Sequence, residues 1–411
     1  MATDIANNPA CSDKNAGEQH GFCSNANLKL DDLLRPMLRY VRHMMGMEVA
    51  FISEFSAGRR YFRALDADDS FCPIALGGSD LLDESFCQRV VDGRLPELMV
   101  DARTYAEALS LHATLALPVG GHISVPVRFS DGSVFGTFCC FSRYAVELDQ
   151  RDLETMRLFG AMISQYLQHD RDVWQERQVI RERILETILR RDWDIYLQPM
   201  FAANSQQVVG YEALCRFAQQ PHTEQWFLEA EQVDLIEELE MACLLSALEV
   251  LPDIPADQFV SFNLSPQTLI RMDLQQLPVQ FASQMVIELT EHRLVDDYQP
   301  LLEALLQLKC SGIRFAVDDA GAGFASFRHV LQLQPDLIKL DRSLISGIAS
   351  CHAQQALARA LIGFSREMQI TTIAEGVETF EEGQCMQDLG VDLIQGYWLG
   401  RPQPAAAVLD N

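Results

Sequence analysis

The sequence is poor in positive charge. Its 411 residues include 32 Lys and Arg against 58 Asp and Glu, so the formal net charge is −26. Such an excess of negative charge argues against a protein that binds duplex nucleic acid or an anionic membrane surface. A small anionic substrate remains compatible with this charge, because bound divalent cations reverse the local charge of a site.

Long apolar runs and paired cysteine motifs are also missing. No segment approaches the roughly 18 to 20 apolar residues that a membrane span needs, and the start MATDIANNPACSDKN has no signal-peptide pattern. The eleven cysteines, from Cys11 to Cys385, include no CxxC pair and no zinc-type spacing. We therefore expect a cytoplasmic protein whose thiols are mostly buried and reduced.

The length predicts two folded parts. Residues 1–27 are rich in Asn, Ser, Asp and Gly and are expected to form a flexible tail. The pattern then predicts a small α+β domain over 28–147, linker helices over 148–190, and a larger domain over 191–411. The linker has apolar residues every three or four positions, which fits either two surface helices or a signalling helix that pairs across a dimer.

The first domain begins with an amphipathic helix, LDDLLRPMLRYVRHMMG, followed by strand-like segments and a hairpin signal at Ser130-Asp131-Gly132. The stretches ESFCQRVVDGRLP and VPVRFSDGSVFGTFCCFS resemble a GAF domain. This resemblance implies an input by an unknown small molecule or protein, and a homodimer. Cys87 is either an attachment point for a chromophore or redox group, or a small core residue.

The second half alternates eight apolar, strand-like runs with amphipathic helices over about 220 residues, which is the order and size of a (β/α)₈ barrel. The runs are DIYLQP, VVGYEAL, FVSFNLS, MVIELTE, IRFAVDD, LIKLD, TTIAEGV and DLIQGYW. The fold class is thus an α/β TIM-type barrel preceded by an α+β domain.

Polar residues recur late in these runs, where the strands of a barrel converge on one mouth. They are Glu212, Asn263, Glu288, Asp318, Asp319, Lys339, Glu375 and Gln395. Several carboxylates in one mouth repel each other unless cations neutralise them, and an all-oxygen set suits Mg²⁺ or Mn²⁺. Adjacent strand residues point to opposite faces, so we expect the strand to end between Asp318 and Asp319. Taken singly, an acid is more often a helix cap or rim charge, and Lys339 a buried ion-pair partner.

The same positions resemble the EAL-domain family of cyclic-di-GMP phosphodiesterases over about residues 175–405. The resemblance rests on Tyr211-Glu212-Ala213-Leu214 with Arg216, on Gln198-Pro199, Asn263-Leu264-Ser265, Glu288-Leu289-Thr290-Glu291, Asp318-Asp319, Lys339, Glu375-Gly376-Val377-Glu378 and Gln395-Gly396. It implies a barrel whose first strand runs against the others, and hydrolysis of cyclic di-GMP to linear pGpG.

The resemblance also implies roles for these residues. Two cations per site, Mg²⁺ or Mn²⁺, would be held by Glu212, Asn263, Glu288, Asp318, Asp319 and Glu375. Glu212, Lys339 and Glu375 would be catalytic, with Lys339 orienting the water and Glu375 either base or ligand alone. Gln198, Arg216 and Gln395 would contact substrate, while Glu291 and Glu378 would support the ligands.

One segment departs from the family pattern. The loop reads DDAGAGFASF, where Ala320 and Ala322 replace a Phe and a Thr, and Phe324 replaces a Tyr. This change bears on loop packing, dimer coupling and rate. The alternative to an enzyme is a catalytically silent receptor or scaffold that binds cyclic di-GMP, but such relatives typically lose metal-ligating acids, and this chain retains all of them.

Overall fold

The computed structural model describes residues 26–68, 70–111, 119–218, 222–290, 298–320 and 330–409, with backbone only at 319 and 320. Contacts divide the chain into two compact units, Met1–Glu176 and Arg177–Asn411. The predicted tail lies outside the described residues, except that Ala26 and Asn27 already belong to the first helix.

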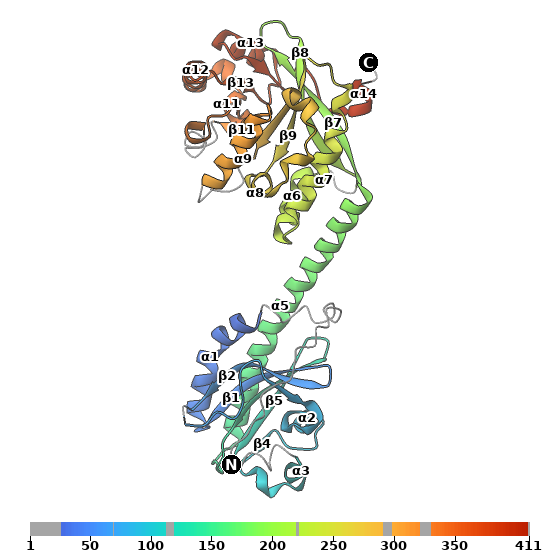
Figure 1. The fold of residues 1–411 in the computed structure, drawn as a ribbon. Coiled ribbons are helices and arrows are strands. Elements are labelled where there is room, and N and C mark those ends of the chain that lie inside the picture. Colours follow the sequence, from blue (N-terminus) through green and yellow to red (C-terminus); the bar gives the residue numbers. More distant parts are fainter. Residues whose placement is uncertain are drawn as a thin grey trace, which may run out of the picture. The chain divides into compact units, whose positions relative to one another are not determined.

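The first unit is built on a six-stranded antiparallel sheet in the order β3-β2-β1-β6-β5-β4 (Figure 1). Its elements are α1 (Ala26–Met44), β1 (Val49–Ser56), β2 (Arg59–Ala67), β3 (Ser79–Leu81), α2 (Phe86–Val91), β4 (Leu98–Met99), α3 (Ala106–Leu109), β5 (His122–Arg128) and β6 (Val134–Phe141). The predicted hairpin joins β5 to β6, with Gly132 at φ 82°, a conformation that glycine adopts at low cost.

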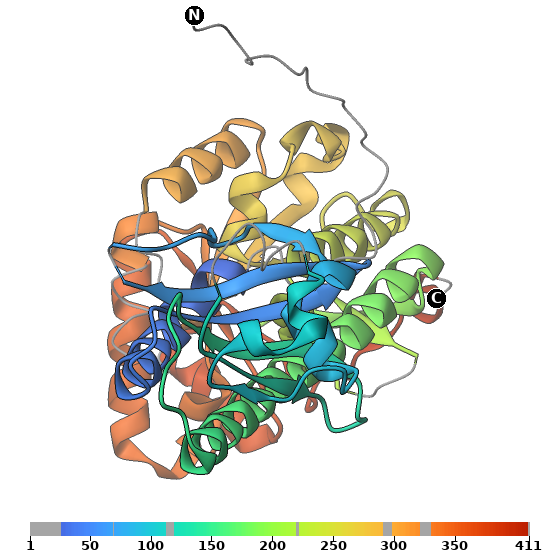
Figure 2. The same cartoon turned by 90° about the horizontal axis from the view of Figure 1, so that it is seen from below.

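Helices cover both faces of this sheet (Figures 1 and 2). Alternate residues of each strand point to opposite faces, so Phe138 and Cys140 of β6 join a core with α1 and the first half of α5 (Gln150–Arg190). Cys139 and Phe141 face a second core formed with α2 and the segment that follows it. The α+β class predicted for this segment is confirmed.

The second unit is a closed barrel (Figure 1). Its strands are β7 (Trp193–Ala202), β8 (Val208–Phe217), β9 (Phe259–Leu264), β10 (Met285–Leu289), β11 (Arg314–Ala320), β12 (Leu337–Leu340), β13 (Thr371–Ala374) and β14 (Leu393–Ile394). Neighbours from β8 to β14 pair in parallel, whereas β7 is antiparallel to both β8 and β14 and so closes the ring. A short β15 (Gln403–Pro404) also pairs with β7. The eight predicted strands and the reversed first strand are confirmed.

Helices surround the barrel and bury the outward-facing side chains of its strands. They are α6 (Thr223–Gln232), α7 (Ile236–Leu248), α8 (Pro266–Arg271), α9 (Gln299–Cys310), α11 (Arg342–Ile345), α12 (His352–Glu367), α13 (Phe380–Leu389) and α14 (Ala405–Leu409). In the part of the chain that the structure describes, no helix is both long and apolar enough to cross a membrane.

Inside the barrel lies a separate apolar layer, which forms the floor of the mouth. Seven strands contribute one residue each: Met200, Phe259, Val286, Ala316, Leu337, Ile373 and Leu393. Because side chains alternate along a strand, the residue two positions further on points into the same interior, one layer closer to the mouth.

Helix α5 is a single helix of 41 residues rather than two. Its first half contributes Leu153, Met156 and Leu167 to the core of the first unit. Its second half contributes Ile184 to a core that also contains Trp226 of α6. Trp226 is fully buried, stacks on Phe217 with 4.8 Å between ring centroids, and lies under the Arg183 guanidinium.

We expect Trp226→Ala to lower the free energy of unfolding by about 3–5 kcal/mol, because it removes a buried aromatic side chain from between α5 and β8. Leu228→Ala, on the same helix but at a side chain that is 45% exposed, is the matched control and should cost far less. Urea unfolding followed by circular dichroism measures both. Equal effects of the two substitutions would contradict this packing.

Candidate active site

The polar side chains predicted at the strand ends stand directly on the apolar floor. Glu288 follows Val286 by two residues, and the same spacing separates Ala316 from Asp318, Leu337 from Lys339, Ile373 from Glu375, and Leu393 from Gln395. The antiparallel β7 reverses the order, so that Gln198 precedes Met200. The alternation of each strand therefore places an apolar residue below and a polar residue at the mouth.

The Lys339 ammonium is the centre of this cluster. The residue is 1% exposed, and Nζ donates to Glu288 Oε2 at 2.6 Å and contacts Glu375 Oε1. Glu212 Oε2 lies 3.4 Å and Asp318 Oδ1 3.7 Å from the same nitrogen. Lys339 is thus a buried ion-pair partner, and its partners are the acids predicted to be catalytic or to bind metal.

Two amides fix the Glu212 carboxylate. Asn263 Nδ2 donates to Oε1 at 2.8 Å, and Gln395 Nε2 donates to Oε2 at 2.7 Å. The Asn263 side chain therefore contacts the site, while the cap of the following helix α8 is Ser265. Gln395 is 3% exposed, and its hydrogen bond holds Glu212 in place. The sequence predicted a contact with substrate for Gln395 but not this contact with Glu212.

The pKa of Glu212 is shifted in the opposite direction from those of Glu288 and Glu375. Burial raises the pKa of Glu288 to about 8, with repulsion from Glu212 and Asp318 adding to it against the attraction of Lys339. Burial likewise raises the pKa of Glu375 well above its ordinary value. Burial also acts on Glu212, but Lys339 and the two amide donors bring its pKa below the ordinary value. One ammonium thus leaves part of the acid cluster to be neutralised by protons or by cations.

The donor set fits divalent cations, although it is not preassembled. Among the described residues, no group of three or more His, Cys, Asp or Glu side chains is arranged to hold a metal ion, and the Lys339 ammonium contacts both Glu288 and Glu375. Glu288 Oε1 is nevertheless buried without a hydrogen-bond partner. A hard cation would satisfy such a carboxylate oxygen, and carboxylate and amide oxygens are the ligands that Mg²⁺ and Mn²⁺ prefer.

The prediction that the strand ends between Asp318 and Asp319 is wrong. Strand β11 continues to Ala320, and its register against β12 shifts between Val317 and Ala320, which pair with Ile338 and Leu340. Three steps on β11 match two on β12, so β11 carries one extra residue. Such a bulge breaks the strict alternation of a strand at these two acids. The side chain of Asp319 lies outside the described residues.

The remaining predicted residues lie around the cluster. Gln198 pairs in register with Glu212, and its Nε2 lies 3.5 Å from the Gly400 carbonyl oxygen. The Arg216 guanidinium donates to the Cys215 carbonyl oxygen at 2.9 Å. The Glu378 carboxylate is 42% exposed and pairs with Arg342 at 2.8 Å. Glu291 and the loop at 321–329 lie outside the described residues.

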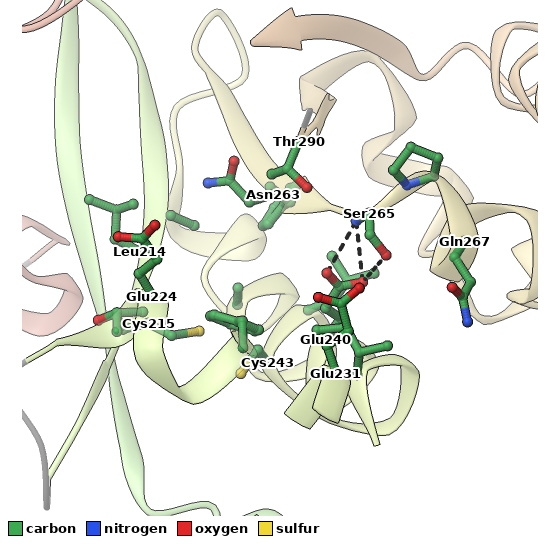
Figure 3. A pocket seen from close by; sticks show the side chains of 18 of the residues that line it. Leu214, Cys215, Glu224, Glu231, Glu240, Cys243, Asn263, Ser265, Gln267 and Thr290 are labelled. Atoms are coloured by element: carbon green, nitrogen blue, oxygen red, sulfur yellow. Dashed lines mark hydrogen bonds between the residues drawn. The ribbon is translucent and has the colours of Figure 1, made fainter. Parts of the chain in front are cut away.

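A pocket of about 700 Å³ adjoins the cluster between β8, β9, α6, α7 and α8 (Figure 3). Arg216 and Asn263 line it together with apolar side chains such as Phe227 and Leu244. The pocket includes Glu240, which was not predicted from the sequence. Its carboxylate accepts hydrogen bonds from the Ser265 amide at 3.2 Å and hydroxyl at 2.7 Å, and so holds the turn after Asn263. The available signal was weak, since Glu240 stands between Leu239 and Met241 in the acidic first part of α7.

We expect Lys339→Met to destabilise the metal-free protein by about 3–5 kcal/mol, because it leaves buried carboxylates without their cation. Lys309→Met is the control, since Lys309 pairs with Asp336 at 3.8 Å on the surface, where an ion pair contributes about 1 kcal/mol or less. Urea unfolding at pH 8 in a chelating buffer measures both. A loss at position 339 no larger than that at 309 would show that the ammonium does not hold the acids together.

Comparisons with known proteins agree with this geometry. Residues 181–402, more than half of the chain, match the EAL domain model, and residues 27–168 match a GAF domain model. The cyclic di-GMP phosphodiesterase PdeB of Shewanella oneidensis is 31% identical over 197 residues, which are 46% of this chain and 23% of that protein. MucR of Pseudomonas aeruginosa, a bifunctional diguanylate cyclase/cyclic di-GMP phosphodiesterase, is 29% identical over 257 residues, 57% of this chain and 36% of that protein.

The chain thus spans well under half the length of these relatives. Among solved structures, the EAL enzyme Bd1971 in its cAMP- and cyclic-di-GMP-bound form has a TM-score of 0.54 at 16% identity, covering 89% of this chain and 92% of that one, which supports the fold alone. The closed barrel, the polar cluster at its mouth and the match to the family model agree. The chain belongs to the EAL-domain family and carries a GAF domain ahead of the barrel.

Proposed function

We propose that the protein is a metal-dependent phosphodiesterase that hydrolyses cyclic di-GMP to linear pGpG. The observation that carries this proposal is the convergence of Glu212, Glu288, Asp318 and Glu375 around one buried cluster, with a carboxylate oxygen of Glu288 left without a partner. A domain that served as a scaffold would have no use for these buried acids, which destabilise it unless they are neutralised.

Glu212, Asn263, Glu288 and Asp318 would hold one divalent cation, Mg²⁺ or Mn²⁺. Asp318, Asp319 and Glu375 would hold a second. When bound, such a pair of cations lowers the pKa of the attacking water and neutralises charge on the phosphate during in-line displacement.

The protein's own groups complete the site. Asn263 donates to Glu212 through Nδ2, which leaves its amide oxygen for a cation. Although burial opposes the charge, the surrounding carboxylates keep the pKa of Lys339 well above its ordinary value, so the ammonium stays charged. Lys339 would therefore donate a hydrogen bond to the water and offset negative charge, while Glu212 and Glu375 would fix the reacting groups beside it.

The substrate would lie across the mouth toward the pocket. Arg216 offers a planar fork suited to a phosphate, and it lines the pocket together with Asn263. The apolar walls there suit a guanine base. Gln198 and Gln395 would help to hold the nucleotide, and Glu291 and Glu378 would support the loops that carry the ligands.

The purified protein should convert cyclic di-GMP to pGpG with Mg²⁺ or Mn²⁺ and not with a chelator. Glu212→Ala should lower the rate by at least about 100-fold, since even outer partners of metal ligands cost 10- to 100-fold. Glu303→Ala, at an exposed acid of α9, should leave the rate unchanged. Product analysis by ion-pair chromatography reads out each reaction. Tight binding without product in metal-replete buffer would instead identify a silent receptor.

We also propose that the GAF domain regulates the barrel through α5 and that the protein acts as a homodimer. Helix α5 contributes buried residues to a core in each unit, at Leu153 to Leu167 and again at Ile184 and Thr187. Of the residues described for α5, none between Leu167 and Ile184 is buried. This middle section is held by surface contacts instead, such as Arg171 with Asp131 and Arg177 with Asp234. A change in one unit would therefore reach the other along the helix.

Glu176→Pro should change the rate of cyclic-di-GMP hydrolysis, because an interior proline costs about 3 kcal/mol and breaks the helix at an exposed position. Glu176→Ala keeps the helix and should leave the rate unchanged. Steady-state kinetics and sedimentation velocity give the rate and the oligomeric state of each variant. An unaltered rate in the proline variant would exclude control through α5.

A further inference from the structure

The GAF domain contains a pair of buried cysteines in contact. Cys87 lies on α2 and Cys139 on β6, both are fully buried, and their sulfurs are 3.3 Å apart. A disulfide requires about 2.05 Å between the sulfurs, so these are two thiols that a shift of little more than 1 Å would join. Both cysteines are free in the structure. The placement of Cys87 agrees with a core residue, but its surroundings are polar.

A buried cation lies beside this pair. Arg60 Nη1 contacts Cys87 Sγ at 2.9 Å, and Arg60 Nε donates to Asp80 at 2.9 Å. On the other side, Ser124 Oγ lies 2.9 Å and Thr137 Oγ1 3.1 Å from Cys139 Sγ. An arginine is rarely buried without an anionic partner, and the anionic partners of Arg60 are Asp80 and a Cys87 thiolate.

The surroundings make the two sulfurs unequal. Burial alone would raise the pKa of Cys87, but hydrogen bonding from Cys139 and the charge of Arg60 bring it down to about 6. Burial and the neighbouring Cys87 raise the pKa of Cys139 well above its ordinary value. Cys87 is therefore the thiolate and Cys139 the thiol, which is the asymmetry that a nucleophilic and a resolving cysteine need.

The pair differs from a metal site and from ordinary core packing. Buried His122 lies nearby, with its ring 5.0 Å from that of Phe86, yet no group of three metal-binding side chains occurs among the described residues. Cys140, next in sequence, faces the opposite core and behaves as an ordinary buried cysteine, because burial raises its pKa and outweighs the charge of Arg42. A cysteine that only packs in a core needs no cation beside its sulfur, whereas Cys87 has the Arg60 guanidinium there.

We propose that Cys87 and Cys139 form a peroxide-sensitive thiol pair that closes to an intramolecular disulfide. The Cys87 thiolate attacks a hydroperoxide, the O–O bond breaks, and the alkoxide or hydroxide that leaves takes up one proton, which gives a sulfenic acid at Cys87. Cys139 then attacks that sulfur, the S–O bond breaks, and water leaves with the Cys139 proton. Two thiols and one peroxide thus yield a disulfide, one alcohol or water, and one further water.

The cluster reaches solvent through Arg60. The Asp80 side chain is 44% exposed, whereas that of Arg60 is 9% exposed and that of Cys87 is fully buried. The guanidinium therefore spans the distance from the surface to the sulfur, and a small peroxide can reach Cys87 when this side chain moves. A thiol reductant would reverse the disulfide by the same route.

The decisive experiment treats the full chain with hydrogen peroxide, blocks remaining thiols under denaturing conditions and maps tryptic peptides by mass spectrometry. Trypsin leaves Cys72 with Cys87 in peptide 64–89 and Cys140 with Cys139 in peptide 129–143. The assignment is therefore made in a Cys72→Ser/Cys140→Ala background, where each peptide has one cysteine, and by fragmentation of the linked peptides from the unaltered chain.

The expected result is a linked pair of these peptides that forms with peroxide and disappears with dithiothreitol. Cys87→Ser should abolish it, and Cys139→Ser should leave a sulfenic acid at Cys87 that dimedone labels. Peroxide treatment that leaves Cys87 and Cys139 unlinked, while exposed Cys72 is oxidised, would overturn the proposal. The linkage does not depend on hydrolysis of cyclic di-GMP, so it is tested independently of the proposed enzyme activity.

A second measurement tests the role of Arg60. Arg60→Gln should slow the oxidation of Cys87 at pH 7 by about tenfold and move the midpoint of its pH profile upward, since removing the cation lowers the thiolate fraction. Arg59→Gln, at the neighbouring residue on the other face of β2, should leave both unchanged. A pH midpoint that stays the same in Arg60→Gln would show that the arginine does not activate the thiol.

Discussion

The ion pairs of Lys339 are the interaction on which the barrel site depends. A single ammonium, almost without exposure, lies within reach of four carboxylates delivered by β8, β10, β11 and the end of β13. Burying the carboxylates without the ammonium, or the ammonium without the carboxylates, would be costly, so each kind of charge is tolerated only because the other is present. The apolar floor beneath them keeps the cluster dry on one side, which strengthens every attraction and every repulsion within it.

Closure of the barrel gives this cluster its remaining contacts. Glu212 and Gln395 are 183 positions apart and meet because β7 pairs with both β8 and β14. The reversed direction of β7 also explains why its polar residue, Gln198, precedes its floor residue in the chain. The ring of strands, rather than any local motif, thus turns separate polar side chains into one site.

The same physical constraint acts in the GAF domain. Arg60 is a second buried cation, held between Asp80 on one side and Cys87 on the other, under the rings of Phe51 and Phe62. Lys339 has four carboxyl groups around it, whereas Arg60 contacts one carboxylate and one sulfur. In both units a buried positive charge lies at the group of side chains for which we propose chemistry.

The strands and their polar ends could be predicted because the same pattern repeats along the sequence of the barrel. The barrel runs are short and apolar and alternate with amphipathic helices, and the polar residues at the mouth recur late in each run. What failed was the prediction at Asp318, where the strand continues through a bulge instead of ending, because a bulge depends on pairing with β12 and not on local composition. Glu240 was missed for a similar reason, since its partner Ser265 is 25 positions away.

The sequence by itself determined which oxygen-bearing residues lie at the strand ends, because they recur late in successive apolar runs. Only the tertiary structure decided which of them are joined by a hydrogen bond or an ion pair. It showed Gln395 holding Glu212, Lys339 joining the acids, and Arg60 beside a pair of cysteines 52 positions apart. Such contacts depend on distances set by the whole fold, and local sequence patterns do not contain them.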